Sequence, residues 1–491
     1  MSIVANKFEE LPSPIICPKL KLLMLKLRFE DPFKLQDDFF DEMSNINVLS
    51  LRGYGYVESI LHFPASIRRL SSLRTLCLSD LRLDDISFIG ELVELKILSI
   101  RDCELEEVPV EIGKLTNLIM LELRYDYLEK LKRIPAGVLS RLVRLEELHI
   151  MGVEDCSYST FREVESLSKL TALSLRECSE DVIYIPSNLG LSSKLARDNV
   201  EGIEFPLLRE MLLWSLPELQ NLWPKANNSI TDSNPLFDEK VSCPNLELLS
   251  IDEANSISAL CSPQLPTDYF TKLQTLQVSH CGKLRNLMSP SVAKGLLNLK
   301  KLQIENCESM EEVITKGEGI MTLFPLLEIL DFRNLPKLGH FFLTECALKF
   351  PFLEGVNIED CPEMKTFVQQ GISVSTPSLR NVNFDDMAKV DDLNKWIQQR
   401  FNNKEQEASD GNKAEPSHSV ARVSTVDRLK DLHQEANVQR MAPVGQHTME
   451  KSTTAGSGEN EESRNSGFSL FSFTPDPFCL KEGMVRNILQ I

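Results

Sequence analysis

The sequence predicts an α/β solenoid with a long parallel sheet on its concave face. An apolar frame, LxxLxL, recurs fourteen times, and successive copies follow one another at nearly constant intervals. Eleven of the thirteen intervals fall within the 20–29 residues of a leucine-rich repeat. The first apolar residue of each frame, its first anchor, is Leu20, Ile46, Leu73, Leu95, Leu118, Leu145, Leu170, Leu208, Leu246, Leu273, Leu299, Leu327, Leu353 and Leu379.

Each frame predicts one short strand followed by a return path. Alternation along a strand places the second and third apolar residues in the core and the residues between them on the outer face. A single repeat cannot bury its apolar edge, so about fourteen repeats are expected to stack into one solenoid. Below, a position is counted from the first anchor of its repeat.

Five cysteines share position eight, where leucine-rich repeats place a buried Asn or Cys. The rival interpretation is a metal or redox cluster, which needs paired spacing such as C-x-x-C, and the sequence has none. We therefore expect packed thiols, with no metal and no cofactor. These cysteines are Cys103, Cys178, Cys281, Cys307 and Cys361.

Two intervals of 38 residues interrupt the regular spacing, one before and one after Leu208. The second contains 225–240, a polar stretch that predicts a surface loop. The first contains 192–202, which we interpret as the place of a degenerate repeat.

The ends of the chain differ from the repeats in composition. Residues 1–19 form a lead-in before the solenoid, which is expected over 20–390. Apolar residues on one side of 391–401 predict a short helix that caps the last repeat. Residues 402–467 are rich in Ser, Glu, Asn, Gly and Lys and predict a disordered tail. The final segment, 468–491, is apolar again and carries no motif with a recognisable role.

Charge and hydropathy exclude several classes of protein. The chain has 53 Lys and Arg against 72 Asp and Glu, a net charge of −19, which disfavours binding to nucleic acid or anionic membranes. The sequence contains no run of 18 apolar residues, so it predicts no membrane span. Acidic residues near the N-terminus precede any apolar stretch of the kind that a secretory signal requires. Twelve cysteines in 491 residues are expected as reduced thiols, so the sequence predicts a cytoplasmic protein.

Catalytic motifs are absent from the sequence. The seven histidines are scattered, and neither a G-x-S-x-G elbow nor an H-E-x-x-H helix occurs. Adjacent carboxylates such as Glu311 and Glu312 fall in predicted loops and are interpreted as solvated charge. The sequence therefore predicts a binding protein, not an enzyme.

Position six of each repeat gives the outermost column of the concave face. Its first half carries five cations and no anion, whereas its last six members carry four anions and one cation, and a tryptophan stands at the change of sign. The column is a partner-binding stripe in one interpretation and ordinary solvated surface in the other. The candidate binding residues are Arg52, Arg101, Arg124, Arg176, Trp214, Asp252, Glu305 and Glu359. The complete column is Lys26, Arg52, Ser79, Arg101, Arg124, Met151, Arg176, Trp214, Asp252, Ser279, Glu305, Arg333, Glu359 and Asp385.

The repeat region resembles the leucine-rich-repeat domain of plant coiled-coil nucleotide-binding leucine-rich-repeat disease resistance proteins. The resemblance covers roughly 1–401 and thins between 178 and 207. It rests mainly on the segments 63–78, 108–150, 215–223, 281–314, 350–367 and 392–401.

In that family a nucleotide-binding switch domain precedes the repeats. Its phosphate-binding loop, G-x-x-x-x-G-K-[ST], does not occur in this sequence, so no nucleotide is expected to bind. The resemblance implies a non-enzymatic sensor or regulatory module of an immune receptor. Its protein partner would be a switch domain supplied in trans, a host guard protein or a pathogen effector. A receptor-derived scaffold or decoy, and a substrate adaptor of the ubiquitin system, are the alternatives.

Overall fold

The computed structural model describes most of the predicted solenoid. The predicted degenerate repeat at 192–202, most of the loop at 225–240, the chain after Gly411 and the segment 468–491 lie outside the described residues. The described residues are 2–5, 16–27, 35–53, 60–105, 107–125, 131–155, 163–176, 203–217, 219, 235–317, 323–383 and 390–411.

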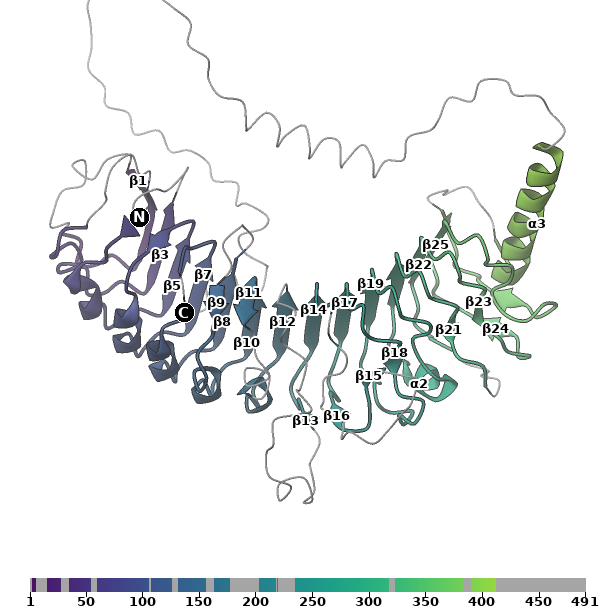
Figure 1. Cartoon of the computed structure of the whole chain (residues 1–491), viewed down its shortest axis with the longest axis horizontal. Coiled ribbons are helices and arrows are strands. Elements are labelled where there is room, and N and C mark those ends of the chain that lie inside the picture. The colour runs from purple at the N-terminus through teal and green to yellow at the C-terminus, as the bar shows by residue number, and fades with distance from the viewer. Residues whose placement is uncertain are drawn as a thin grey trace, which may run out of the picture. The chain divides into compact units, whose positions relative to one another are not determined.

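A fifteen-stranded parallel sheet confirms the predicted fold class, and its strands line one face of the stack (Figure 1). Every one of the fourteen predicted frames contains a strand. One further strand, β1, lies in the predicted lead-in and pairs with β2. The strands, in sheet order, are β1 Ser2–Ala5, β2 Leu22–Leu27, β3 Val48–Gly53, β5 Thr75–Ser79, β7 Ile97–Arg101, β8 Met120–Arg124, β10 Glu147–Met151, β12 Ala172–Arg176, β14 Glu210–Trp214, β17 Leu248–Asp252, β19 Thr275–Ser279, β20 Lys301–Glu305, β22 Ile329–Arg333, β25 Gly355–Glu359 and β27 Asn381–Val382.

Each strand pairs with the equivalent strand of the next repeat, position for position. Leu148 of β10, for example, pairs with Leu121 of β8 on one side and with Leu173 of β12 on the other. All three side chains are buried, because alternate residues of each strand face the core. Equivalent positions of successive repeats therefore stand side by side in columns along the sheet.

The return paths are short helical turns and small sheets on the other side of the core. The helices are η2 Ala65–Arg69, η3 Ser87–Glu91, η4 Val110–Lys114, η5 Leu139–Arg141 and α2 Pro290–Gly295. The two-stranded sheets pair β4 Ile60–Leu61 with β6 Arg82–Leu83, β9 Leu131–Arg133 with β11 Val153–Asp155, β13 Ile203–Glu204 with β16 Val241–Ser242, β15 Pro235–Phe237 with β18 Ala259–Cys261, β21 Glu312–Ile314 with β23 His340–Phe342, and β24 Leu348–Lys349 with β26 Val374–Ser375.

Position seven, directly after the strand, takes a left-handed conformation in nine repeats. In eight of these described repeats its N–H donates to the position-six carbonyl of the next strand, as from Asp102 to Arg124 at 2.7 Å and from His280 to Glu305 at 2.9 Å. Asn, Asp and Gly adopt this conformation at least cost, which accounts for six of the nine residues. The nine are Asp80, Asp102, Gly152, Ser215, Glu253, His280, Asn306, Asn334 and Asp360.

The predicted burial of the position-eight cysteines is confirmed for Cys103, Cys281 and Cys307, whereas Cys361 is half-buried. Each thiol donates back to the carbonyl two residues earlier, as Cys103 does to Arg101 at 3.2 Å. Burial raises the pKa of the Cys103 thiol to about 12. Contact with Cys307 and burial raise the pKa of Cys281 as well. The fifth cysteine, Cys178, lies outside the described residues.

Asparagines at the position before the first anchor tie neighbouring turns together. The side-chain amide of Asn117 donates to the Val93 carbonyl at 3.0 Å, one repeat earlier. Asn45 and Asn298 make the same bond to the carbonyls of Pro18 and Thr271. These side chains donate hydrogen bonds to loop carbonyls that lie outside the ladders of the sheet.

The helix α3, Leu393–Gly411, begins close to the predicted start but runs ten residues beyond Phe401, where the sequence analysis ended it. Leu393 and Ile397 belong to the hydrophobic core. The buried Asn394 accepts from the N–H groups of Phe367 and Val368, at 2.8 and 3.2 Å, and donates to the Gln369 and Ile372 carbonyls at 3.2 and 2.7 Å. Asn394 thus fastens the first turn of the helix to the preceding loop.

Candidate functional site

The register assembles the predicted position-six residues into one continuous column. Its thirteen described members, from Lys26 to Glu359, are paired neighbour to neighbour across the sheet. Adjacent strands lie ~4.8 Å apart, so neighbouring charges interact within the Debye length of ~8 Å. The fourteenth member, Asp385, lies outside the described residues.

The basic half of the column is less positive than the column alone indicates. The Arg101 guanidinium contacts the Glu122 carboxylate at 2.9 Å, and Ser99 donates to the same carboxylate at 2.7 Å. Arg52 pairs with Asp80 at 3.1 Å. Glu122 lies at position four, which faces the same side of the sheet as position six. The sequence analysis did not include that column and so missed the counter-charge.

Trp214 stands where the column changes sign and is half-buried between two polar side chains. Its indole N–H donates to the Ser250 hydroxyl at 3.0 Å. The Arg176 guanidinium lies over the indole, 5.6 Å from the ring centroid, at cation–π distance. These contacts fix the ring at the centre of the concave face.

A hollow of about 330 Å³ opens beside Trp214. It joins three of the predicted binding residues to four polar residues that the sequence analysis did not select. Its lining is Arg176, Trp214, Ser250, Asp252, Gln277, Ser279 and Gln303. The two serines are short and stand between larger side chains, which explains the depression.

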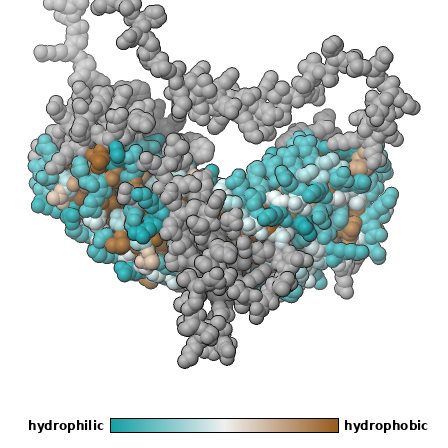
Figure 2. Space-filling view, viewed as in Figure 1, coloured by the Kyte–Doolittle hydropathy of each residue, from teal (hydrophilic) through white to brown (hydrophobic). Residues whose placement is uncertain are grey.

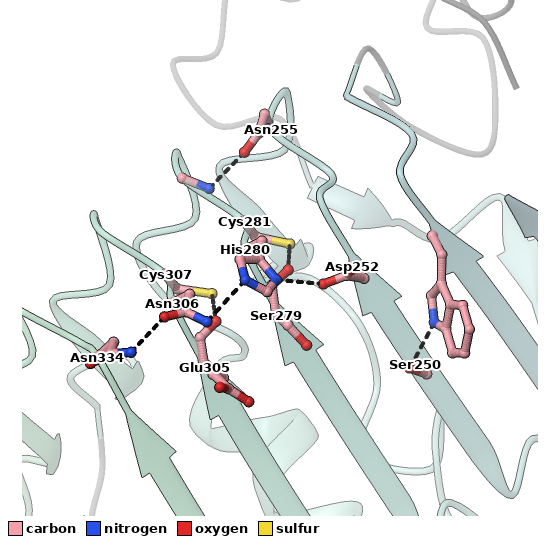
Figure 3. A network of polar contacts seen from close by, with 12 residues as sticks. Ser250, Asp252, Asn255, Ser279, His280, Cys281, Glu305, Asn306, Cys307 and Asn334 are labelled. Carbon is pink, nitrogen blue, oxygen red and sulfur yellow. Dashed lines mark hydrogen bonds and ion pairs between the residues drawn. The ribbon is translucent and has the colours of Figure 1, made fainter. Parts of the chain in front are cut away.

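A chain of hydrogen bonds runs from Asp252 along the edge of the sheet (Figure 3). Asn334 donates to the Asn306 side-chain oxygen at 2.7 Å, and the Asn306 amide contacts His280 Nε2 at 2.9 Å. His280 Nδ1 contacts Asp252 Oδ1 at 2.8 Å. Because Nε2 accepts from Asn306, Nδ1 carries the proton and donates to the carboxylate. The chain of bonds therefore orients Asp252.

The acidic half keeps more of its charge than the basic half. Its one cation, Arg333, forms a bidentate pair with Asp331 at 2.9 Å for both contacts. Asn357 also donates to Asp331, at 3.0 Å. Glu305 accepts from the Gln303 amide, at 3.5 Å, and is half-exposed. The surface over the late repeats is mostly hydrophilic in the view of Figure 2.

In the described part of the chain, no three His, Cys, Asp or Glu side chains are grouped so that they could hold a metal ion.

No helix within the described ranges is both long enough and apolar enough to cross a membrane.

Comparison with known proteins places the repeats in a specific class. Residues 245–386 match the family of leucine-rich repeats of RPS2-like plant disease resistance proteins. The leucine-rich repeats of this chain are similar to those of plant disease resistance proteins. The resemblance identified in the sequence is therefore confirmed.

Two curated relatives align with most of this chain. A disease resistance protein of Arabidopsis thaliana is 24% identical over 414 residues, 69% of this chain and 40% of its own length. A probable disease resistance protein of the same plant is 26% identical over 345 residues, 69% of this chain and 38% of its own. The chain thus spans about two fifths of the length of these relatives.

A solved structure also aligns with the domain. It is the Arabidopsis receptor kinase HAESA, crystallised with a peptide hormone and a co-receptor. The identity is 18%, with 73% of this chain and 55% of that chain covered and a TM-score of 0.35.

Proposed function

We propose that this leucine-rich-repeat domain is a non-enzymatic protein-interaction module, the sensor and regulatory part of a plant intracellular immune receptor. It acts in the cytoplasm in the defence response. The names of the relatives support the biological setting. The unbroken position-six column, with its hollow at Trp214, supports the concave face as the binding surface.

The partner of the basic half would be an acidic protein face. In the resembled family the early repeats commonly lie against the nucleotide-binding switch domain, while the later repeats contribute more to recognition. Arg52, Arg124 and Arg176 suit the first role, because a planar guanidinium binds carboxylates bidentately. Arg101 contributes less, because its pair with Glu122 is largely shielded from water, whereas the pair of Arg52 with Asp80 is exposed. A host guard protein or a pathogen effector would then meet the acidic half.

The test uses a nucleotide-binding domain of a plant disease resistance protein, supplied in trans. Exposed ion pairs are worth only ~0.2–1 kcal/mol each, so single substitutions should have little effect. Reversing Arg52, Arg124 and Arg176 together to Glu should weaken the association, and the loss should shrink as salt concentration rises. Arg101 is left unchanged, because Glu in its place would face Glu122 and destabilise the fold.

The matched control reverses Asp252, Glu305 and Glu359 to Lys. This variant carries the same number of charge reversals in the same column and should retain the association with the switch domain. Equal binding by both triple variants would show that the column is ordinary solvated surface.

A further inference from the structure

We propose that the hollow beside Trp214 is a subsite for one basic side chain, arginine or lysine, on an extended segment of a partner protein. The inference rests on the proposed function, since it names the chemistry of a partner that the concave face binds. No group of residues that could hold a metal ion includes the hollow within the described part of the chain.

The size of the hollow fits a side chain. Its volume of about 330 Å³ is at the lower end of the ~300–1,000 Å³ of small-molecule pockets. Ser250 in β17 and Ser279 in β19 form its low part, and Trp214 and Gln303 rise on either side. A long, thin side chain entering from a segment above the sheet fills such a space.

The charges around Ser279 favour a cation. Asp252 and Glu305 are the register neighbours of Ser279 on its two sides, each one strand spacing of ~4.8 Å away, so a charge above Ser279 lies between the two carboxylates. Arg176 lines the hollow three strands away from Ser279, where its guanidinium lies over the Trp214 indole. The attraction of the two carboxylates therefore outweighs repulsion by Arg176.

The wall and floor of the hollow suit the rest of such a residue. The aliphatic stem of arginine or lysine packs on apolar surface while its charged end stays polar, and the Trp214 indole supplies that surface. The Gln277 amide donates to Gln303 at 3.2 Å, which leaves amide groups in a row beneath an extended backbone. An extended segment along the column can exchange hydrogen bonds with that row.

Asp252 is oriented before any ligand arrives. His280 holds one of its oxygens at 2.8 Å, and Asn306 holds His280 (Figure 3). A carboxylate ordered in advance loses less conformational freedom on binding than a mobile one, so affinity rises. His280 and Asn306 each stand in a left-handed backbone conformation after their own strand, β19 and β20, which fixes this arrangement to the backbone.

The experiment uses two synthetic peptides, acetyl-Gly-Ser-Arg-Ser-Gly-amide and the same peptide with citrulline in place of arginine. Citrulline keeps the shape of arginine and removes its charge. Binding to the full chain is followed by the indole N–H signal of Trp214, assigned with Trp214→Phe. We expect saturable shifts with the arginine peptide and at least ~10-fold weaker binding of the citrulline peptide, a difference of ~1.4 kcal/mol.

Two position-six serines give a matched pair of variants. Ser279→Arg places a fixed cation in the hollow and should abolish peptide binding, whereas Ser79→Arg, in the same position of β5, should leave it unchanged. Asp252→Asn and Glu305→Gln keep the side-chain size, so a loss of binding in them reports charge even if Ser279→Arg folds poorly. Each should weaken the arginine peptide several-fold.

Equal binding of the two peptides, or binding unchanged by Ser279→Arg, Asp252→Asn and Glu305→Gln, would overturn the proposal. These outcomes are separable from the test of the proposed function, which uses the basic half and a protein domain. If the arginine and citrulline peptides bound equally well while the switch domain still associated, the hollow would not be a subsite and the proposed function would stand.

Discussion

The Arg101 guanidinium and the Glu122 carboxylate meet at 2.9 Å across the neighbouring strands β7 and β8. Their side chains are only 17% and 9% exposed, so this pair is largely shielded from water. Position six of one repeat is thus balanced by position four of the next, and the pair contributes to stability as well as to surface charge.

Glu122→Gln should lower the free energy of unfolding by about 3–5 kcal/mol, because it removes the negative charge from a largely shielded ion pair. Denaturant melts of the whole chain measure the loss. Arg101→Met combined with Glu122→Leu should recover most of it. The exposed pair Arg52 and Asp80 is the control, and removing it should change stability by at most ~1 kcal/mol. Equal losses at both pairs would contradict the role of burial.

Gly152→Ala should destabilise the solenoid. Gly152 has φ of +69°, and a Cβ there would lie 2.2 Å from the Tyr125 carbonyl oxygen. The left-handed backbone alone costs a non-glycine residue about 1–3 kcal/mol, and the clash adds to it. Gly355→Ala is the matched control, because nothing lies within 4 Å of its Cβ. Its melting temperature should stay unchanged or rise slightly, by the equivalent of about 0.4–1 kcal/mol.

Asn394→Ala should release helix α3 from the last turns. The substitution leaves the buried N–H groups of Phe367 and Val368 without the acceptor that Asn394 supplies, and each buried unpaired group costs about 1–3 kcal/mol. Hydrogen exchange should speed up in the helix and in 366–374. Asn402→Ala, on an exposed face of the same helix, should leave the exchange pattern as it is.

Stability should fall in alkaline solution as buried thiols begin to ionise. Burial raises the pKa of Cys103 and Cys243 to about 12, from an ordinary value of 9.0. Unfolding exposes these thiols, so above pH 9 the unfolded chain holds fewer protons than the folded one. The linkage then lowers the free energy of unfolding as pH rises between about 9 and 12.

Melts across that range test the slope, and Cys103→Ala with Cys243→Ala should flatten it. Alkylation at pH 8 gives a second measurement. The half-buried Cys17 and Cys346 should react in the folded chain, whereas Cys103 and Cys243 should react only after unfolding. Rapid labelling of all four in the native chain would contradict the buried assignment.

The sheet could be predicted from the sequence because each strand carries its own LxxLxL frame. Strand β1 was missed because Ser2–Ala5 has only part of that frame and depends on pairing with β2. Helix α3 was predicted too short, since its polar second half has no apolar face to reveal it.

The candidate site was predictable only in part. Counting six residues from each anchor located Trp214 and the charged column, because the register is uniform. The hollow depends on side-chain size in two columns at once, with Ser250 in one and Ser279 in the other. Glu122 and Asp331, the partners of Arg101 and Arg333, lie in the position-four column. The prediction considered only position six, although alternation along the strand places both columns on the same face.

The pairing of β12, β14 and β17 shows that the register of the concave face does not depend on the number of residues between strands. Leu173 pairs with Met211 and Met211 with Leu249, steps of 38 residues each, yet both pairs keep the register found where the step is 27, as from Leu249 to Leu276. The extra residues fall between these strands in the sequence, and the columns stay aligned. Segments between strands can therefore be lengthened, shortened or exchanged between relatives while the order of concave side chains is preserved, so recognition and segment length are free to evolve independently.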